Sequence, residues 1–161
     1  MSTKKILLII GSVLIAGAAI LATVKIISNS SKQSPEEPQT IALEKRVAEM
    51  SQEICPIIDP DGFGVITHLT LEDSCLTYNV FVKDESIDFV ALQKLLDEAD
   101  DMPAVTLRMI MDQGGEASEA MWDFLETNRL GIKTKLTNQK EETCFVIASF
   151  DSLSEEYYRF K

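Results

Sequence analysis

The chain of 161 residues carries 26 acidic and 15 basic side chains, a formal net charge of −11, and its mean hydropathy is +0.04. The length excludes a large multi-domain enzyme, since single domains commonly have about 100 to 150 residues. The acidic excess argues against nucleic acid as a partner, because phosphates are neutralised by clustered Lys and Arg. A mean hydropathy above zero is unusual for a chain that is 25% charged, so the apolar residues must be concentrated in one segment.

Charge divides the chain into two unlike parts. Residues 1–40 carry four lysines and two glutamates, a net charge of +2. The remaining 11 basic and 24 acidic side chains lie in residues 41–161, which therefore have a net charge of −13. We expect this second part to form an acidic folded domain.

An apolar run without a charged residue extends from Ile6 to Val24. At about 1.5 Å per residue, a helix of this length covers most of a hydrocarbon core about 30 Å thick, and two isoleucines after Lys25 extend it. The sequence therefore predicts an N-terminal transmembrane anchor over residues 1–27, which contacts the membrane through residues 6–27.

A cleaved signal peptide is the alternative for this segment. Lys4 and Lys5 supply the basic start that either kind of segment needs, and residues 16–18 read Ala-Gly-Ala, which fits a cleavage site. Cleavage there would leave a strongly apolar new N-terminus, so the sequence favours an uncleaved signal anchor. Lys4, Lys5 and the amino terminus lie on one side of the segment, and Lys25 and Lys32 lie on the other. By this narrow margin the positive-inside count favours a cytoplasmic N-terminus and a periplasmic domain.

Small residues recur one helical turn apart within the apolar run, as at Ser12 and Ala16. This spacing lets two helices approach closely. A homodimer is compatible with the sequence but is not required by it.

A polar segment over residues 28–40 contains two prolines and no large apolar side chain. Such a composition buries too little surface to offset the entropy of ordering, which predicts a flexible linker. Fully extended, it reaches about 45 Å.

The folded part is expected to begin with a helix and a β-hairpin. Apolar residues recur at helical spacing up to Cys55, where the helix should stop because Pro56 restricts the residue before it. Two alternating segments rich in Val, Ile, Thr, Tyr and Phe then predict a hairpin. The expected elements are a helix over 40–55, a turn over 59–62 and strands over 63–71 and 76–82.

Helical segments occupy the middle of the domain. An apolar stripe that begins with Phe89 follows Asp88, and Pro103 is placed to open a helix that continues to Met111. Alternating apolar residues over 105–111 also allow a strand there. The last helical segment spans Glu116 to Leu130, with Gly131 at the expected stop.

A second hairpin is expected over 132–136 and 144–150, across the polar residues 138–142. After it, Leu153, Tyr157 and Phe160 align on one side of a short helix, which either packs back on the domain or docks on a partner or the membrane interface. Trp122 flanks an apolar helical stripe and is expected in the core. The order α-ββ-αα-ββ predicts an α+β domain over 41–161, with an antiparallel sheet packed on helices.

Three short motifs carry a resemblance. They are Ile54-Cys55-Pro56-Ile57 before a turn, Leu76-Thr77-Tyr78-Asn79-Val80 in a strand, and Leu130-Gly131-Ile132-Lys133 before the last hairpin. With the N-terminal anchor, the chain resembles small, functionally uncharacterised bacterial envelope proteins that have a signal or anchor segment and one α+β domain. The resemblance implies location and fold, and it brings no catalytic residue with it.

Three cysteines are present: Cys55, Cys75 and Cys144. In an oxidising compartment one pair and an odd thiol can form, and the sequence leaves all three pairings open. The alternative is that Cys75 and Cys144 pack as small apolar strand residues while Cys55 ends a helix. No C-x-x-C occurs, so a thioredoxin-like or common zinc site lacks its usual spacing.

His68 is the single histidine and lies in an alternating strand. If Val65, Thr67 and Leu69 face the core with Leu71, His68 faces away from it and is exposed. Catalysis with a cysteine nucleophile would require a thiol beside it and a third group to orient it, and no spacing demands this.

Clustered carboxylates were the remaining candidates for chemistry. Residues 59–62 (Asp-Pro-Asp-Gly) resemble the opening of a calcium loop, but an EF-hand would need ligands where Phe63 and Thr70 stand. The acidic run at Asp97, Glu98, Asp100 and Asp101 is typical of a solvated helix face, with a cation or basic-partner site as the alternative. The sequence predicts no catalytic, cofactor-binding or metal-ligating residue and no cofactor.

The anchor, the linker and the lack of a catalytic constellation favour a membrane-tethered, non-enzymatic domain of the bacterial cell envelope that binds a protein or a ligand. The alternative is an envelope hydrolase or thiol enzyme whose site is assembled from sequence-distant residues, with the three cysteines and His68 as its candidates.

Overall fold

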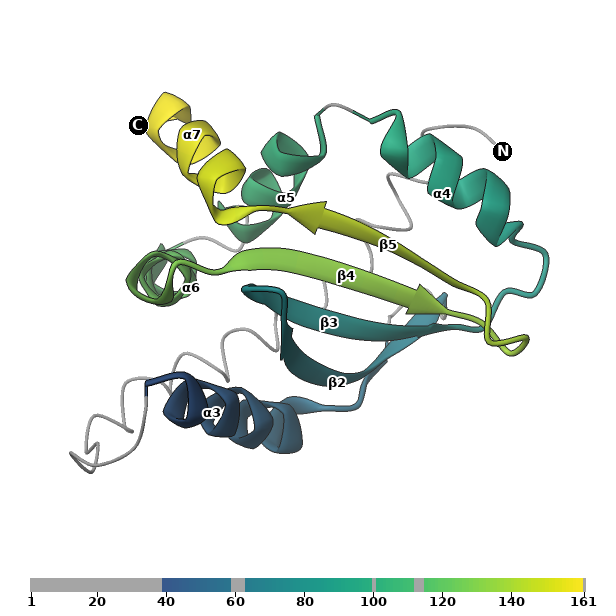
Figure 1. Cartoon of the computed structure of the whole chain (residues 1–161), viewed down its shortest axis with the longest axis horizontal. Coiled ribbons are helices and arrows are strands. Elements are labelled where there is room, and N and C mark those ends of the chain that lie inside the picture. The colour runs from purple at the N-terminus through teal and green to yellow at the C-terminus, as the bar shows by residue number, and fades with distance from the viewer. Residues whose placement is uncertain (1–38, 59–62, 100, 112–114, 161) are drawn as a thin grey trace.

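The computed structural model describes residues 39–58, 63–99, 101–111 and 115–160 (Figure 1). The predicted anchor, nearly all of the predicted linker and the predicted turn at 59–62 lie outside the described residues. Within the described residues, no helix combines the length and the apolar character needed to cross a membrane.

The described elements form an α+β domain around one sheet. The helical elements bury apolar faces, and β5 alternates between buried and exposed residues, whereas the central strand β3 is buried on both faces. In chain order the elements are α3 (Gln39–Ile54), β1 (Ile57–Ile58), β2 (Gly64–Glu72), β3 (Cys75–Val82), α4 (Phe89–Asp97), α5 (Met102–Met111), α6 (Gly115–Asn128), β4 (Gly131–Thr137), β5 (Thr143–Ala148) and α7 (Phe150–Phe160).

The sheet has five strands in the order β1-β2-β3-β4-β5, and it is mixed rather than antiparallel. All neighbours are antiparallel except β3 and β4, which run parallel. The predicted antiparallel sheet was wrong at this pair because the two strands are not joined by a hairpin: the chain between them forms the helices α4 to α6. A long helical crossover returns the chain to the same end of the sheet, which makes the next strand parallel.

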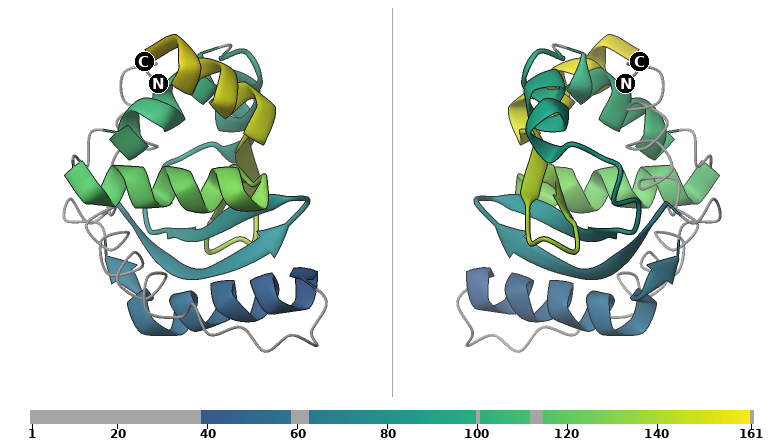
Figure 2. Two further views of the ribbon diagram at one scale, coloured as in Figure 1. Left: turned by 90° about the vertical axis from the view of Figure 1, so that its left-hand side faces the viewer. Right: turned by 90° about the vertical axis from the view of Figure 1, so that its right-hand side faces the viewer.

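One face of the sheet forms the core with the helices. Leu76, Tyr78 and Val80 of β3 share this face with Ile132 and Leu136 of β4, and all five are buried. Buried side chains of α3 to α7 join the same cluster. Figure 2 shows α3 running along the curved β2–β3 hairpin, at the opposite end of the molecule from α7.

A β-bulge in β2 changes which residues face the core. The register with β3 shifts between Ile66 and His68, so that Ile66 and Leu69 are both buried while Thr67 and His68 are both exposed. The predicted alternation put Thr67 inside and Ile66 outside. It was wrong there because the extra residue of a bulge reverses the phase of the strand.

The end of α6 is set by Arg129 rather than by Gly131. Arg129 has a left-handed φ of 51°, and the amide of Leu130 donates to the carbonyl of Leu125 at 2.9 Å, which closes a Schellman motif. Gly131 instead begins β4, where a Cβ would lie 2.6 Å from the carbonyl oxygen of Ala148. The glycine is therefore needed for close strand approach.

Two further expectations concern the segment from Pro103 and the end of the last strand. The segment from Pro103 is helical within α5, not a strand. The last strand stops at Ala148 instead of Phe150, because Ser149 caps α7: its hydroxyl accepts from the Ser152 amide at 3.2 Å and its carbonyl accepts from the Leu153 amide at 3.0 Å.

Candidate functional site: the outer face of the sheet

The face of the sheet opposite the core, here called the outer face, is largely polar. Strand register assigns its residues, since side chains alternate between the two faces. On β2 to β5 they are Val65, His68, Thr70, Glu72, Cys75, Thr77, Asn79, Phe81, Lys133, Lys135, Thr137, Thr143, Phe145 and Ile147.

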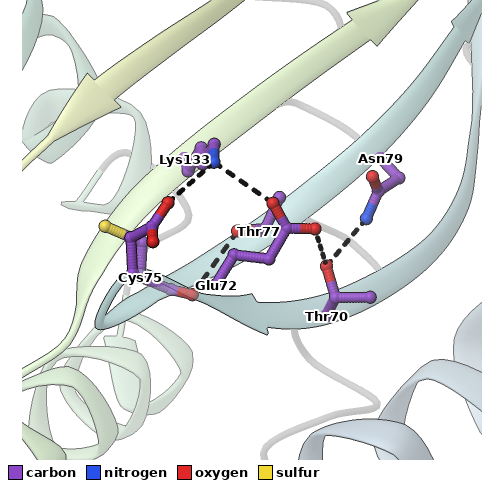
Figure 3. Close-up of polar contacts among 7 residues, drawn as sticks. Thr70, Glu72, Cys75, Thr77, Asn79 and Lys133 are labelled. Carbon is purple, nitrogen blue, oxygen red and sulfur yellow. Dashed lines mark hydrogen bonds and ion pairs between the residues drawn. The ribbon is translucent and has the colours of Figure 1, made fainter.

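Lys133 binds two carboxylates at one end of this face (Figure 3). Its Nζ lies 3.1 Å from Oε2 of Glu72 and 3.2 Å from Oδ2 of Asp73. Asp73 is in the two-residue turn between β2 and β3, where it and Ser74 have left-handed φ values of 52° and 59°. The ion cluster therefore joins the first hairpin to a strand of the second.

A chain of hydrogen bonds continues from the ion cluster across β2 and β3 (Figure 3). The amide Nδ2 of Asn79 donates to Oγ1 of Thr70 at 3.0 Å, and the Thr70 hydroxyl donates to Oε1 of Glu72 at 3.0 Å. Asn79 is buried, so its donor needs this acceptor. The donors and acceptors of this network are paired with one another, which holds the side chains in a fixed arrangement.

Electrostatics keeps the central pair ionised. The hydrogen bond from Lys133 is the main cause that lowers the pKa of Glu72, and the hydrogen bond to Glu72 is the main cause that raises the pKa of Lys133. Both shifts move the pKa of the group further from neutral pH. The cluster therefore suits recognition and structural support rather than general acid–base catalysis, which needs a pKa near the working pH.

Exposed apolar side chains lie beside the ion cluster, and the Lys133 ammonium is 5.6 Å from the centroid of the Phe145 ring. Phe145 and Ile147 of β5 are 46% and 45% exposed. In the register, Phe145 lies opposite Lys135 of β4, and Ile147 lies opposite Lys133. Lys135 is half-buried; it forms no hydrogen bond or ion pair with a described residue, and its charge helps to lower the pKa of Glu72.

The three cysteines are separate free thiols. Cys75 is on the outer face and Cys144 is on the core face two strands away, beyond the Cα separation of about 7 Å that a disulfide allows. Burial raises the pKa of Cys144 to about 12 and also raises those of Cys75 and Cys55. The prediction that Cys75 and Cys144 pack as buried strand residues is confirmed, and no thiol has the lowered pKa of a nucleophile.

His68 is exposed, as predicted, and it is not beside a thiol. It lies opposite Asn79, and Cys75 is four residues further along β3, about 13 Å away at the rise of a strand. The hydroxyl of Thr67 donates to the carbonyl of Asn79, and its oxygen lies 2.8 Å from Nδ1 of His68. The structure therefore does not bring the sequence candidates together as a catalytic pair.

The acidic run near α4 is engaged locally. The Gln93 amide donates to Asp97 at 2.7 Å, and Glu98 lies 4.0 Å from Lys94. Asp100 lies outside the described residues. In the described part of the chain, no group of three or more His, Cys, Asp or Glu side chains is arranged to hold a metal ion.

The aromatic candidates pack within the domain. Trp122 is 2% exposed and stacks on Tyr157 with ring centroids 3.9 Å apart, and Leu153 is also buried. The expectation that the C-terminal stripe packs back is confirmed for Leu153 and Tyr157. Tyr158 is exposed and donates to Glu126 at 2.8 Å.

Sequence reasoning missed the network on the outer face. Its members come from three strands, and Glu72 and Lys133 are 61 residues apart. Lys133 and Lys135 alternate with Ile132, Thr134 and Leu136, which indicates a strand with lysines on one face. This pattern does not indicate which strand lies next to it.

No family model matches this chain, and neither the curated proteins nor the solved structures include a significant match to it.

Proposed function

We propose that this protein is a membrane-tethered, non-enzymatic binding module of the bacterial cell envelope. In this proposal residues 6–27 anchor the chain, residues 28–38 form a flexible linker, and the acidic domain stands in the periplasm. The predicted linker over 28–40 was two residues too long, because Gln39 and Thr40 are in α3. The domain binds another envelope protein through the outer face of its sheet.

The outer face carries this proposal because it combines a fixed polar network with exposed apolar side chains. Phe145 and Ile147 leave nearly half of their surface to solvent on a strand whose other face is buried. Exposed aromatic side chains beside satisfied polar groups are typical of protein interfaces. The alternative of a hydrolase or thiol enzyme gains no support from the geometry of His68 and the three thiols.

Site-specific photo-crosslinking in the native membrane tests the proposal. A photoreactive phenylalanine analogue placed at Phe145 of the full-length protein should give one defined adduct. The matched control is Val90 on α4, another exposed apolar position at 78% exposure, which should give none. The proposal fails if Phe145 and other outer-face positions give no adduct, or if both positions give the same adducts.

The proposed orientation needs its own measurement. The native thiols are buried or half-buried, so a Ser86→Cys variant supplies an exposed one. A membrane-impermeant maleimide should label this variant in cells with a permeable outer membrane and leave the wild type nearly unlabelled. Labelling only after lysis would place the domain in the cytoplasm.

A further inference from the structure

We draw no further inference here: the strongest candidate, the exposed apolar patch of Phe145 and Ile147 beside the ion cluster on the outer face, carries none because nothing in the structure shows what covers it.

Discussion

Lys133 joins two hairpins that are far apart in the sequence. Its side chain is 12% exposed, and its ammonium binds Glu72 of β2 and Asp73 of the following turn. A partly buried ion pair contributes more to the free energy of unfolding than a fully exposed pair does. When one partner is removed, the remaining charge is poorly compensated. The residue therefore contributes to the stability of the outer face as well as to its charge.

Lys133→Ala should destabilise the protein by about 1 to 2 kcal/mol, between the values for exposed and buried pairs. Lys94→Ala, which removes a pair at 4.0 Å between exposed side chains, should cost less than about 0.5 kcal/mol. Urea denaturation followed by Trp122 fluorescence measures both. Equal costs for the two variants would show that the ion cluster does not stabilise the fold.

The pH dependence of the same pair has a defined sign. The lowered pKa of Glu72 means that its contribution is fully present above its unfolded-state value of about 4.3 and is lost as pH falls through the folded-state value. Glu72→Gln should therefore be less stable than wild type at pH 7, and the difference should shrink toward pH 2. A difference independent of pH in denaturation midpoints would contradict this assignment.

The side chain of Asn138 holds the β4–β5 loop in place through hydrogen bonds. Its Oδ1 accepts from the amides of Lys140 and Glu142 at 3.0 Å each, and its Nδ2 donates to the Glu142 carboxylate at 2.6 Å. The side chain is buried, so these bonds replace solvent.

Asn138→Ala should cost about 1 to 3 kcal/mol, because it leaves backbone donors without an acceptor. Gln139→Ala, at an exposed neighbour in the same loop, should be nearly neutral. Thermal unfolding of the two variants provides the comparison. A neutral Asn138→Ala would mean that the loop holds its shape through its backbone alone.

At the scale of elements, side chains of two helices form hydrogen bonds with backbone groups of β2 and β5, in the place that a neighbouring strand would take. Ser51 of α3 accepts from the Leu69 amide of β2 at 2.8 Å, and Gln93 of α4 bonds both backbone groups of Phe145. Unpaired strand edges promote pairing between molecules. The two helices thus protect edges that the strands themselves leave open.

Gln93→Ala should lower stability by about 1 kcal/mol and increase concentration-dependent aggregation, because it frees the Phe145 amide and carbonyl on an edge strand. Gln52→Ala on the exposed side of α3 is the matched control and should have neither effect. Light scattering at increasing protein concentration distinguishes the two variants. Equal aggregation would show that Gln93 does not protect the edge.

Across the whole molecule, the three thiols lie in three separate environments. Cys55 follows α3, Cys75 is buried on the outer face, and Cys144 is in the core. All three thiols are free in this fold, and the strand register separates Cys75 from Cys144. Burial limits the access of reagents to these thiols. It also raises the pKa of each thiol, which lowers reactivity because the thiolate is the reactive form.

Protein purified without a reductant should contain three free thiols, and Cys75 and Cys144 should react with a thiol reagent only after unfolding. Thiol titration of the native and the denatured protein, with mass spectrometry of the labelled peptides, measures this. An intramolecular disulfide in the folded protein would contradict the arrangement of the strands.

Local patterns were sufficient for most elements. The hairpin over β2 and β3 follows from alternation and from residues at the turn that tolerate a left-handed φ, and α4 follows from its stripe and its Asp88 cap, which accepts from the Val90 and Ala91 amides at 3.0 Å. The bulge at Thr67 and the left-handed Arg129 were missed because their energetic causes lie in packing rather than in residue preference. The outer-face network was missed because no local pattern states which strands are neighbours.

By itself, the sequence determined the division into an apolar, basic N-terminal part and an acidic domain, and the α+β class of that domain, because charge and hydrophobic period are properties of neighbouring residues. Only the tertiary structure decided that β3 and β4 are parallel, that the thiols are apart, and that Glu72 and Lys133 meet. These are contacts between distant segments, and their free energy depends on which faces can be buried together.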